Sequence, residues 1–134
     1  MISDLAKVGV KAKLNFMQYK ALREIAQKGS TAVHQMTWGS YSIPDASGCA
    51  GVFFVGGKDD PANDPKVNEL ITKAGNVTDL AEREKLYKEA FQIISDKVYW
   101  LPMFTYAKNY AFNQNLEMTI TSDEIPRFYT AKWK

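Results

Sequence analysis

The sequence predicts an α/β fold, and three observations along the chain support this prediction. Between residues 10 and 38, a strictly alternating segment, a helical segment and a second β-prone segment follow one another. Residues 64–75 and 79–98 carry apolar side chains at helical spacing, and residues 99–112 are rich in aromatic and other β-prone residues. Strand-like and helical segments that alternate in this way are typical of α/β units with parallel strands.

Length and composition limit the classes of function. The chain has 134 residues, of which 46% are hydrophobic and 24% charged, as is ordinary for a single globular domain. Its 17 basic and 15 acidic residues are mixed along the sequence, so no basic patch predicts nucleic-acid binding. No apolar stretch is long enough to span a membrane, and residues 1–10 do not have the pattern of a signal peptide. One cysteine and one histidine provide no metal-ligand cluster, so we expect neither a metal nor a cofactor.

The N-terminal part of the sequence predicts a helix followed by a βαβ unit. An apolar face at helical spacing ends at Gly9, a residue type that commonly terminates a helix. Residues 10–16, VKAKLNF, alternate between apolar and polar side chains, as a half-buried strand does. A helix of roughly ten residues follows and ends at residues 28–30. Residues 32–38, AVHQMTW, then predict a second strand that is parallel to the first.

The middle of the chain predicts a long irregular segment and then a helix. Residues 39–63 are irregular, and only residues 51–55, GVFFV, predict a short strand or a buried turn. Compact domains rarely carry such a segment unless it binds or covers something. Asp64 as the cap and Pro65 at the first helical position then predict a helix that reaches Gly75.

A longer helix and further strands are predicted for the rest of the chain. The helix begins at Asp79, which resembles a capping box together with Glu82. Pro102 marks the beginning or the edge of a following strand, and another short strand is expected around residues 118–121. The apolar stripe of the helix consists of Leu86, Tyr87, Ala90, Phe91, Ile93, Ile94 and Val98.

A polar loop after the second predicted strand is the best candidate for a binding site. Trp38 and Tyr41 open this loop at the carboxyl end of a parallel strand, where α/β sheets bind ligands. The Trp38 ring, the hydroxyl group of Ser40 and the carboxylate of Asp45 suit a small solute with apolar and amine or hydroxyl groups. A packed loop without a ligand is the structural alternative.

No combination of residues has the signature of a catalytic site. Cys49 and His34 are the only Cys/His combination, and the residues around Cys49, SGCAGV, match no nucleophile motif. Asp59, Asp60 and Asp64 lack the spacing of a calcium loop, and turns and helix caps explain them better. We therefore assign no catalytic residue and expect a protein that is not an enzyme. The alternatives are a small stand-alone α/β hydrolytic enzyme that uses Cys49 and His34, and a protein-interaction module.

Several segments, taken in their order along the chain, resemble one bacterial family. They are LAKVGVKAKLNFM, the Trp-Gly loop MTWGSYSIPD, the stretch DPKVNELITKAGNVTDLAEREKLYKEAFQIISDKVYWLPMFTY and the ending IPRFYTAKWK. Together they resemble the C-terminal portion of the extracellular solute-binding proteins of family 5, the dipeptide- and oligopeptide-type receptors of ABC importers. One departure is Tyr41, which stands where peptide-binding members often carry the Asp that holds the amino terminus of the ligand. Asp45, shifted in register, could take its place.

The resemblance implies a fold, a location and partners. The chain would be a fragment of a periplasmic-binding-protein-like C-terminal lobe (type II, cluster C), with residues 1–112 in that lobe and residues 113–134 returning to a missing N-terminal lobe. The parent receptor would be periplasmic and would deliver a peptide or a related solute, including opines or sugars, to an ABC permease. Without the other lobe, Phe128, Tyr129 and Trp133 should expose apolar surface, and the chain should self-associate or swap domains. The expected ligand-binding residues are Trp38, Ser40, Tyr41, Asp45, Tyr106 and Asn109.

Overall fold

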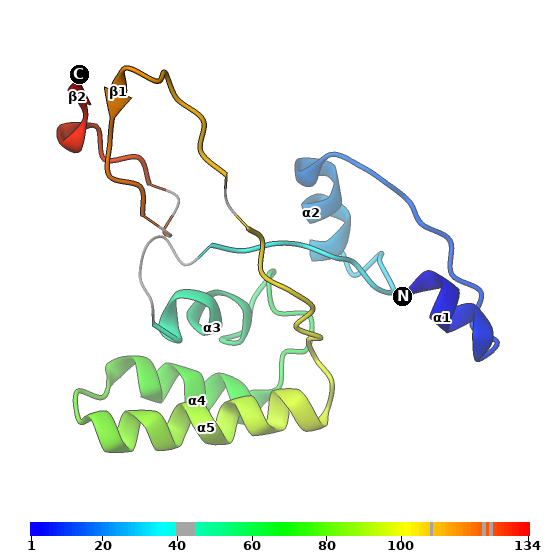
Figure 1. Cartoon of the computed structure of the whole chain (residues 1–134). Helices are drawn as coiled ribbons and strands as arrows, with labels where there is room; N and C mark the ends of the chain where they lie inside the picture. Colours follow the sequence, from blue (N-terminus) through cyan, green and yellow to red (C-terminus); the bar gives the residue numbers. More distant parts are fainter. Residues whose placement is uncertain (40–44, 108, 122, 124) are drawn as a thin grey trace. The chain divides into compact units, whose positions relative to one another are not determined.

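The computed structural model describes residues 1–39, 45–107, 109–121, 123 and 125–134, and these fall into two units, Met1–His34 and Gln35–Lys134 (Figure 1). The first unit contains α1 (Ile2–Lys7) and α2 (Tyr19–Gln27). Among the described residues, no helix is both long and apolar enough to cross a membrane. The second unit contains α3 (Ser47–Phe53), α4 (Pro65–Asn76), α5 (Leu80–Asp96), β1 (Leu116–Glu117), the 3-10 helix η1 (Phe128–Thr130) and β2 (Lys132–Trp133).

Helices α4 and α5 lie side by side and supply most of the buried core of the second unit (Figure 1). The Asp64 carboxylate accepts hydrogen bonds from the backbone N–H groups of Lys66 and Val67, and Pro65 occupies the first helical position, as predicted. Asp79 caps α5 by accepting from the backbone N–H of Glu82. The buried side chains of the two helices are Val67, Leu70, Ile71, Ala74, Leu86, Tyr87, Ala90 and Ile94.

A short helix, α3, covers this pair where the sequence predicts irregular structure. Gly48 and Gly51 lower the intrinsic helix propensity of this segment, so the sequence does not indicate a helix there. Burial compensates for the low propensity, because Ala50, Phe53 and Phe54 all join the core. Of the two alternatives for residues 51–55, the short strand is wrong, because α3 reaches Phe53; Phe53 and Phe54 are buried, as the alternative of a buried turn requires.

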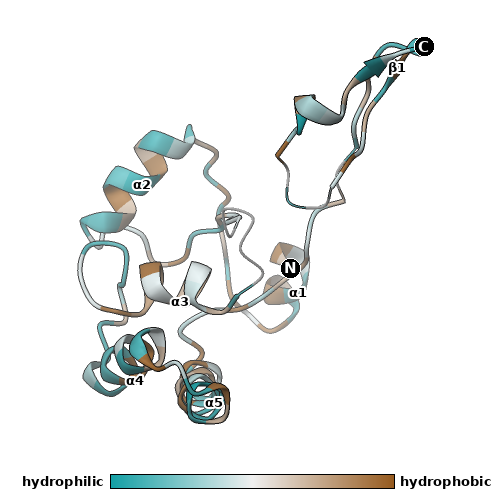
Figure 2. Ribbon diagram, turned by 90° about the vertical axis from the view of Figure 1, so that its left-hand side faces the viewer, coloured by the Kyte–Doolittle hydropathy of each residue, from teal (hydrophilic) through white to brown (hydrophobic). Residues whose placement is uncertain are grey.

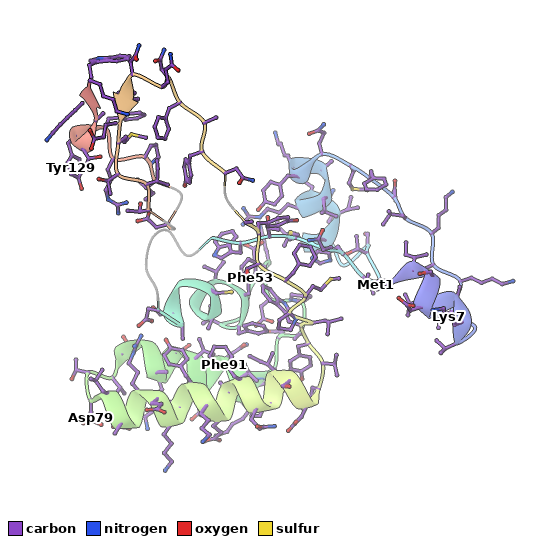
Figure 3. All side chains as sticks on the ribbon, viewed as in Figure 1. Met1, Lys7, Phe53, Asp79, Phe91 and Tyr129 are labelled. Atoms are coloured by element: carbon purple, nitrogen blue, oxygen red, sulfur yellow. The ribbon has the colours of Figure 1, made fainter. Side chains whose placement is uncertain are left out.

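An aromatic cluster fills the space beside α3. The ring of Phe53 lies 4.9 Å from the ring of Trp38 in an edge-to-face arrangement and 4.8 Å from the ring of Trp100. Phe54 contacts Trp100 as well, with 5.2 Å between the ring centroids. Figure 3 shows the labelled Phe53 beside α3 among other side chains, whereas the labelled Tyr129 extends outward from the C-terminal residues. Large aromatic side chains dominate burial energetics, so this cluster fixes residues 38 and 100 on the helices.

The end of α5 departs from the predicted apolar stripe at Val98. The backbone N–H of Val98 donates to the carbonyl of Ser95, and that of Tyr99 donates to the carbonyl of Ile94, which is the hydrogen-bond pattern of a Schellman motif. Val98 has a φ of +51° and its side chain is 68% exposed. Because Cβ opposes this left-handed conformation, a β-branched residue here is strained.

A buried carboxylate joins the start of α4 to the residues after α5. Oδ2 of Asp64 accepts hydrogen bonds of 2.8 Å from both Lys97 Nζ and Tyr99 Oη, and Asp64 is only 8% exposed. These donors, Lys97 first and Tyr99 second, hold the pKa of Asp64 well below its ordinary value. The ion pair in turn raises the pKa of Lys97. Asp64 therefore caps α4 and also connects α4 to the residues that follow α5.

The first unit does not form the predicted βαβ arrangement. Helix α2 is confirmed, and teal and brown residues alternate along it in Figure 2, but neither residues 10–16 nor residues 32–38 are assigned as strands. The described backbone hydrogen bonds include none made by residues 11–17. A strand requires a partner for its backbone groups, and alternation alone specifies two faces but no partner. Gly9, with a φ of +84°, ends α1 as predicted.

The C-terminal residues form a small antiparallel hairpin of their own. β1 pairs with β2, so that Leu116 lies opposite Trp133, which places the short strand two residues before the predicted 118–121. Among the described residues of 99–112, no strand is assigned. The expected exposure of Phe128, Tyr129 and Trp133 is confirmed, at 73%, 84% and 74%.

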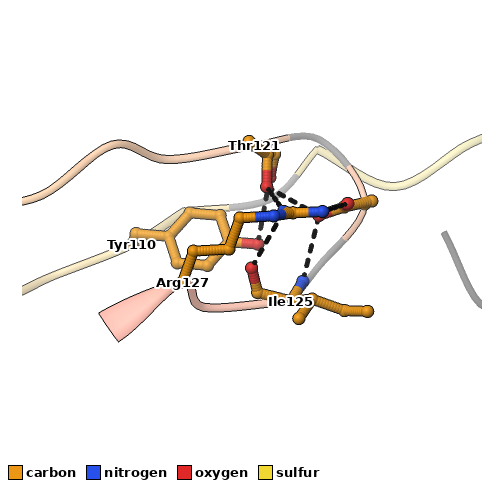
Figure 4. Close-up of polar contacts among 5 residues, drawn as sticks. Tyr110, Thr121, Ile125 and Arg127 are labelled. Atoms are coloured by element: carbon orange, nitrogen blue, oxygen red, sulfur yellow. Dashed lines mark hydrogen bonds and ion pairs between the residues drawn. The ribbon is translucent and has the colours of Figure 1, made fainter. Parts of the chain in front are cut away.

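An arginine closes the loop between the two strands. The Arg127 guanidinium donates to Oγ1 of Thr121, to both carboxylate oxygens of Asp123 and to the carbonyl of Ile125 (Figure 4). The Asp123 carboxylate also accepts from the Thr121 hydroxyl group and from the backbone N–H of Ile125. These contacts lower the pKa of Asp123, with the Arg127 hydrogen bond as the largest cause. The ion pair between Arg127 and Asp123 thus holds this part of the loop together.

Val98→Gly is expected to stabilise the protein. Glycine adopts a positive φ without the Cβ penalty, and the Val98 side chain is mostly exposed, so the free energy of unfolding should rise by about 0.5–1 kcal/mol. The control is Val77→Gly at the end of α4, where φ is −90° and the side chain packs on the core, so glycine should lower the free energy of unfolding by about 1 kcal/mol or more. Urea unfolding measures both values. If Val98→Gly leaves the free energy of unfolding unchanged or lowers it, the positive φ of Val98 does not cost stability.

Acid should weaken the fold partly through Asp64. Its pKa is lower in the folded than in the unfolded chain, so its contribution is complete above about pH 4 and is lost as the pH falls further. Asp64→Asn should lower the stability at pH 7 and flatten its dependence on pH below about 4. The control is Glu69→Gln, an exposed carboxylate on α4 with no described partner, which should leave the profile unchanged. Thermal melts between neutral and acidic pH supply the test, and parallel profiles for Asp64→Asn and the unsubstituted chain would refute it.

Candidate functional site

Trp38 is held against α3 at the start of the predicted binding loop. Its indole N–H donates to the carbonyl of Gly48 at 3.3 Å, and its ring packs edge-to-face on Phe53. The side chain is half-buried. In this arrangement the indole contributes to the packing of α3, so Trp38 fixes the point at which the loop leaves the helical core.

Asp45 is held at the other end of the same loop by Arg83 of α5. The carboxylate oxygens of Asp45 accept hydrogen bonds of 2.8 Å and 2.6 Å from the two terminal nitrogens of Arg83. Oδ1 of Asp45 also accepts from the backbone N–H of Ser47, at the start of α3. The Arg83 hydrogen bonds hold the pKa of Asp45 well below its ordinary value, and the pair raises the pKa of Arg83. The structure therefore uses this carboxylate as an anchor, and its role in ligand binding stays a prediction.

Further contacts fix Arg83 itself. Its Nε donates to the carbonyl of Ala74 in α4, and its guanidinium lies 5.1 Å from the centre of the Tyr87 ring. An arginine with a bidentate carboxylate and an aromatic face below it is held in one orientation. Arg83 thus connects the Asp45 end of the loop to both long helices.

The loop between these two anchors carries the remaining predicted residues of this region. Ser40 and Tyr41 lie outside the described residues, as does the whole segment 40–44. What the structure describes is the position of the two ends, Trp38 and Asp45, which both contact α3. Binding residues commonly lie on loops that a rigid scaffold positions, and the helical core is such a scaffold.

The structure places Tyr106 and Asn109 on the segment between α5 and β1. The Tyr106 ring meets that of Phe104 edge to face at 5.3 Å, and Tyr106 is about half exposed. Asn109 is exposed. Their part in the same site as Trp38 and Asp45 stays a prediction.

The contacts of Cys49 and His34 do not favour a nucleophilic pair. Burial within α3 raises the pKa of the Cys49 thiol, which is the opposite of the activation that a catalytic thiolate needs. His34 belongs to the other unit, and its Nδ1 is 3.2 Å from the Thr31 hydroxyl group. No group of His, Cys, Asp and Glu side chains in the described part of the chain could hold a metal ion.

Within the loop before α4, the Asp60 carboxylate accepts hydrogen bonds from the backbone N–H groups of Gly56 and Asn63, as a turn residue does.

Arg83 is the residue of this region that the sequence did not reveal. It is 38 positions from Asp45, and on the helical pattern it lies with the solvent-facing charges of α5. The one local signal is its spacing of four residues from Tyr87, which allows the guanidinium to lie over the ring. A long-range ion pair of this kind has no periodicity, so only the fold shows it.

Comparisons with protein-family models, with curated proteins and with solved structures gave no match to this chain. The chemistry of the region therefore rests on the contacts described above.

The ion pair between Asp45 and Arg83 should behave as one unit. Asp45→Ala and Arg83→Ala should each lower the unfolding midpoint in urea. The midpoint of the double variant should be no lower than that of the less stable single variant. Arg83→Lys should not restore the midpoint, because lysine cannot form the two parallel hydrogen bonds. Lys85→Ala on the exposed face of α5 is the control and should leave the midpoint unchanged. Additive effects of the two single variants would show that the pair is not coupled.

Proposed function

We propose that this chain is the ligand-binding part of a C-terminal lobe of an extracytoplasmic solute receptor that serves an ABC importer. The ligand is a peptide or a related small molecule, and the binding loop is residues 39–45. The single observation that carries this proposal is the anchoring of both ends of that loop on one helical core, through Trp38 and through Asp45. The protein has no catalytic role in this proposal.

The same ion pair supports the resemblance on which the proposal also rests. Asp45 closes the Trp-Gly loop, and Arg83 belongs to the later stretch DLAEREKLY, so two separate segments of the resemblance are in contact. Within that later stretch, Asp79 caps α5, and Leu86 and Tyr87 are buried. The residues that resemble the family are thus those that build the scaffold of the loop.

Exposed apolar side chains support the presence of a further lobe. The extended segment 10–17 exposes Leu14 and Phe16, and the C-terminal hairpin exposes Tyr129 and Trp133. Single exposed apolar residues are ordinary, but contiguous groups mark surfaces that another protein part covers. In the proposed receptor this part is the N-terminal lobe, and residues 113–134 pack on it.

The proposed mechanism of binding is closure of two lobes around the solute. Contacts from both lobes shift the population toward the closed form, which the permease then recognises. Ser40 and Tyr41 of the anchored loop supply hydroxyl groups and an aromatic face to the ligand, together with Tyr106 and Asn109. The receptor acts in the periplasm.

Calorimetric titration tests the proposal. The complete product of the reading frame, titrated with dipeptides, oligopeptides, opines and sugars, should bind one of these classes with micromolar or tighter affinity. This chain alone should bind the same solute at least about a hundredfold more weakly, because the contacts from the second lobe are absent. In the complete product, Tyr41→Ala should weaken binding by about tenfold or more, whereas Lys85→Ala on the exposed face of α5 should leave the affinity unchanged.

Two results would contradict the proposed function. One is a complete product without a second lobe that binds none of these solutes. The other is full affinity in this chain alone, which would mean that the site needs no second lobe.

A further inference from the structure

The binding loop, residues 39–45, carries one carboxylate, and this carboxylate is already engaged within the chain. Asp45 is the first acidic residue after Glu24, so residues 25–44 contribute none. Its Oδ1 accepts hydrogen bonds from Arg83 and from the backbone N–H of Ser47, and its Oδ2 accepts a second one from Arg83. An ionised carboxylate offers about four acceptor positions, so three of them are occupied. An ammonium group of a ligand would find one.

The charge of Asp45 is compensated as well. Its two carboxylate oxygens lie 2.8 Å and 2.6 Å from the two terminal nitrogens of Arg83, so the pair has no net charge. The Asp45 side chain is 30% exposed and that of Arg83 is 24% exposed, so a ligand that reaches one of them also meets the other. The attraction of an ammonium group to Asp45 is therefore offset by its repulsion from Arg83.

Other contacts hold Arg83 in the orientation that engages Asp45. Its Nε donates to the carbonyl of Ala74 at 3.3 Å, and its guanidinium lies 5.1 Å from the centre of the Tyr87 ring. Tyr87 is itself buried in the core. A planar guanidinium that is fixed by these contacts keeps its two parallel hydrogen bonds to one carboxylate. Asp45 and Arg83 are therefore positioning residues of the loop.

The acidic residues that precede Arg83 by one turn of α5 are engaged too. Asp79 accepts from the backbone N–H of Glu82 as the helix cap. The carboxylate of Glu82 lies 3.4 Å from Nζ of Lys73 in α4. Neither acid is placed to replace Asp45 as the acceptor for an ammonium group.

The other predicted binding residues are uncharged. They offer hydroxyl groups, an amide group and aromatic rings, and they are Trp38, Ser40, Tyr41, Tyr106 and Asn109. Ser40 and Tyr41 lie outside the described residues, and both carry a hydroxyl group. The Tyr106 ring is 52% exposed, and Asn109 is exposed. Hydroxyl and amide groups both donate and accept hydrogen bonds, as sugar hydroxyl groups do, and the negative face of an aromatic ring attracts the C–H groups of a sugar ring.

We propose that the solute is an uncharged molecule rich in hydroxyl groups, a sugar or short oligosaccharide, and that it is not a peptide with a free amino terminus. This inference rests on the proposed function, because it names the class of solute for that same loop. The hydrogen bonds and aromatic contacts of neutral side chains hold the sugar. The ion pair between Asp45 and Arg83 fixes the end of the loop and makes no ion pair with the ligand.

A comparison of solute classes by calorimetric titration tests the inference. The complete product of the reading frame is titrated with glucose, galactose, maltose and cellobiose, and in parallel with Ala-Ala, Ala-Ala-Ala and their N-acetylated forms. We expect one of the sugars to bind at least about a hundredfold more tightly than any of the peptides. A free peptide that binds more tightly than every sugar would overturn the inference and leave the receptor function in place. Binding of no sugar and no peptide would overturn both.

The salt dependence of binding supplies a second readout. The Debye length falls from roughly 10 Å at 0.1 M salt to roughly 3 Å at 1 M, so a contact between a ligand ammonium group and a carboxylate weakens over this range. The dissociation constant of the bound solute should change by less than about threefold between these concentrations of sodium chloride, because no ion pair is involved. Circular dichroism at both concentrations verifies that the helices persist. A larger weakening with salt would show that the site recognises a charged group and would refute the inference.

Discussion

The apolar seam between α4 and α5 is the constraint on which the described structure of the second unit depends. Val67, Leu70 and Ile71 from α4 meet Leu86 and Ala90 from α5, and all are buried. Helix α3 has only seven residues and two glycines, so it has too little intrinsic stability to persist alone. It exists because the seam offers a surface on which its Phe side chains are buried. Loss of the seam would therefore remove α3 and, with it, the support for Trp38.

Two carboxylates repeat one construction at the edges of this seam. Asp64 accepts from backbone N–H groups at the start of α4 and from Lys97 beyond α5. Asp45 accepts from the backbone N–H of Ser47 at the start of α3 and from Arg83 within α5. Each carboxylate thus satisfies a helix start and receives a cation from the α5 region. Asp45, at the end of the predicted binding loop, therefore takes its position from α3 and α5 together.

Extended segments without a strand partner are the other recurring feature of the chain. Residues 10–17, 101–107 and 109–112 include exposed large apolar side chains, and the two strands of the C-terminal hairpin are each two residues long. Exposed backbone donors and acceptors favour pairing with another chain or another lobe. The solute-receptor proposal supplies that partner as a second lobe.

The elements whose signals are local could be predicted from neighbouring residues alone. Asp64 with Pro65, Asp79 with Glu82, and Gly9 mark helix ends through backbone hydrogen bonds within a few residues, and the structure has these ends where they were predicted. The fold was needed to show whether residues 10–16 pair as a strand, because alternation does not provide a partner. It also decided that Asp45 binds Arg83, because an ion pair between positions 38 residues apart has no pattern in the sequence. Local hydrogen bonding can be read from neighbouring residues, whereas pairing and burial depend on what the fold brings together.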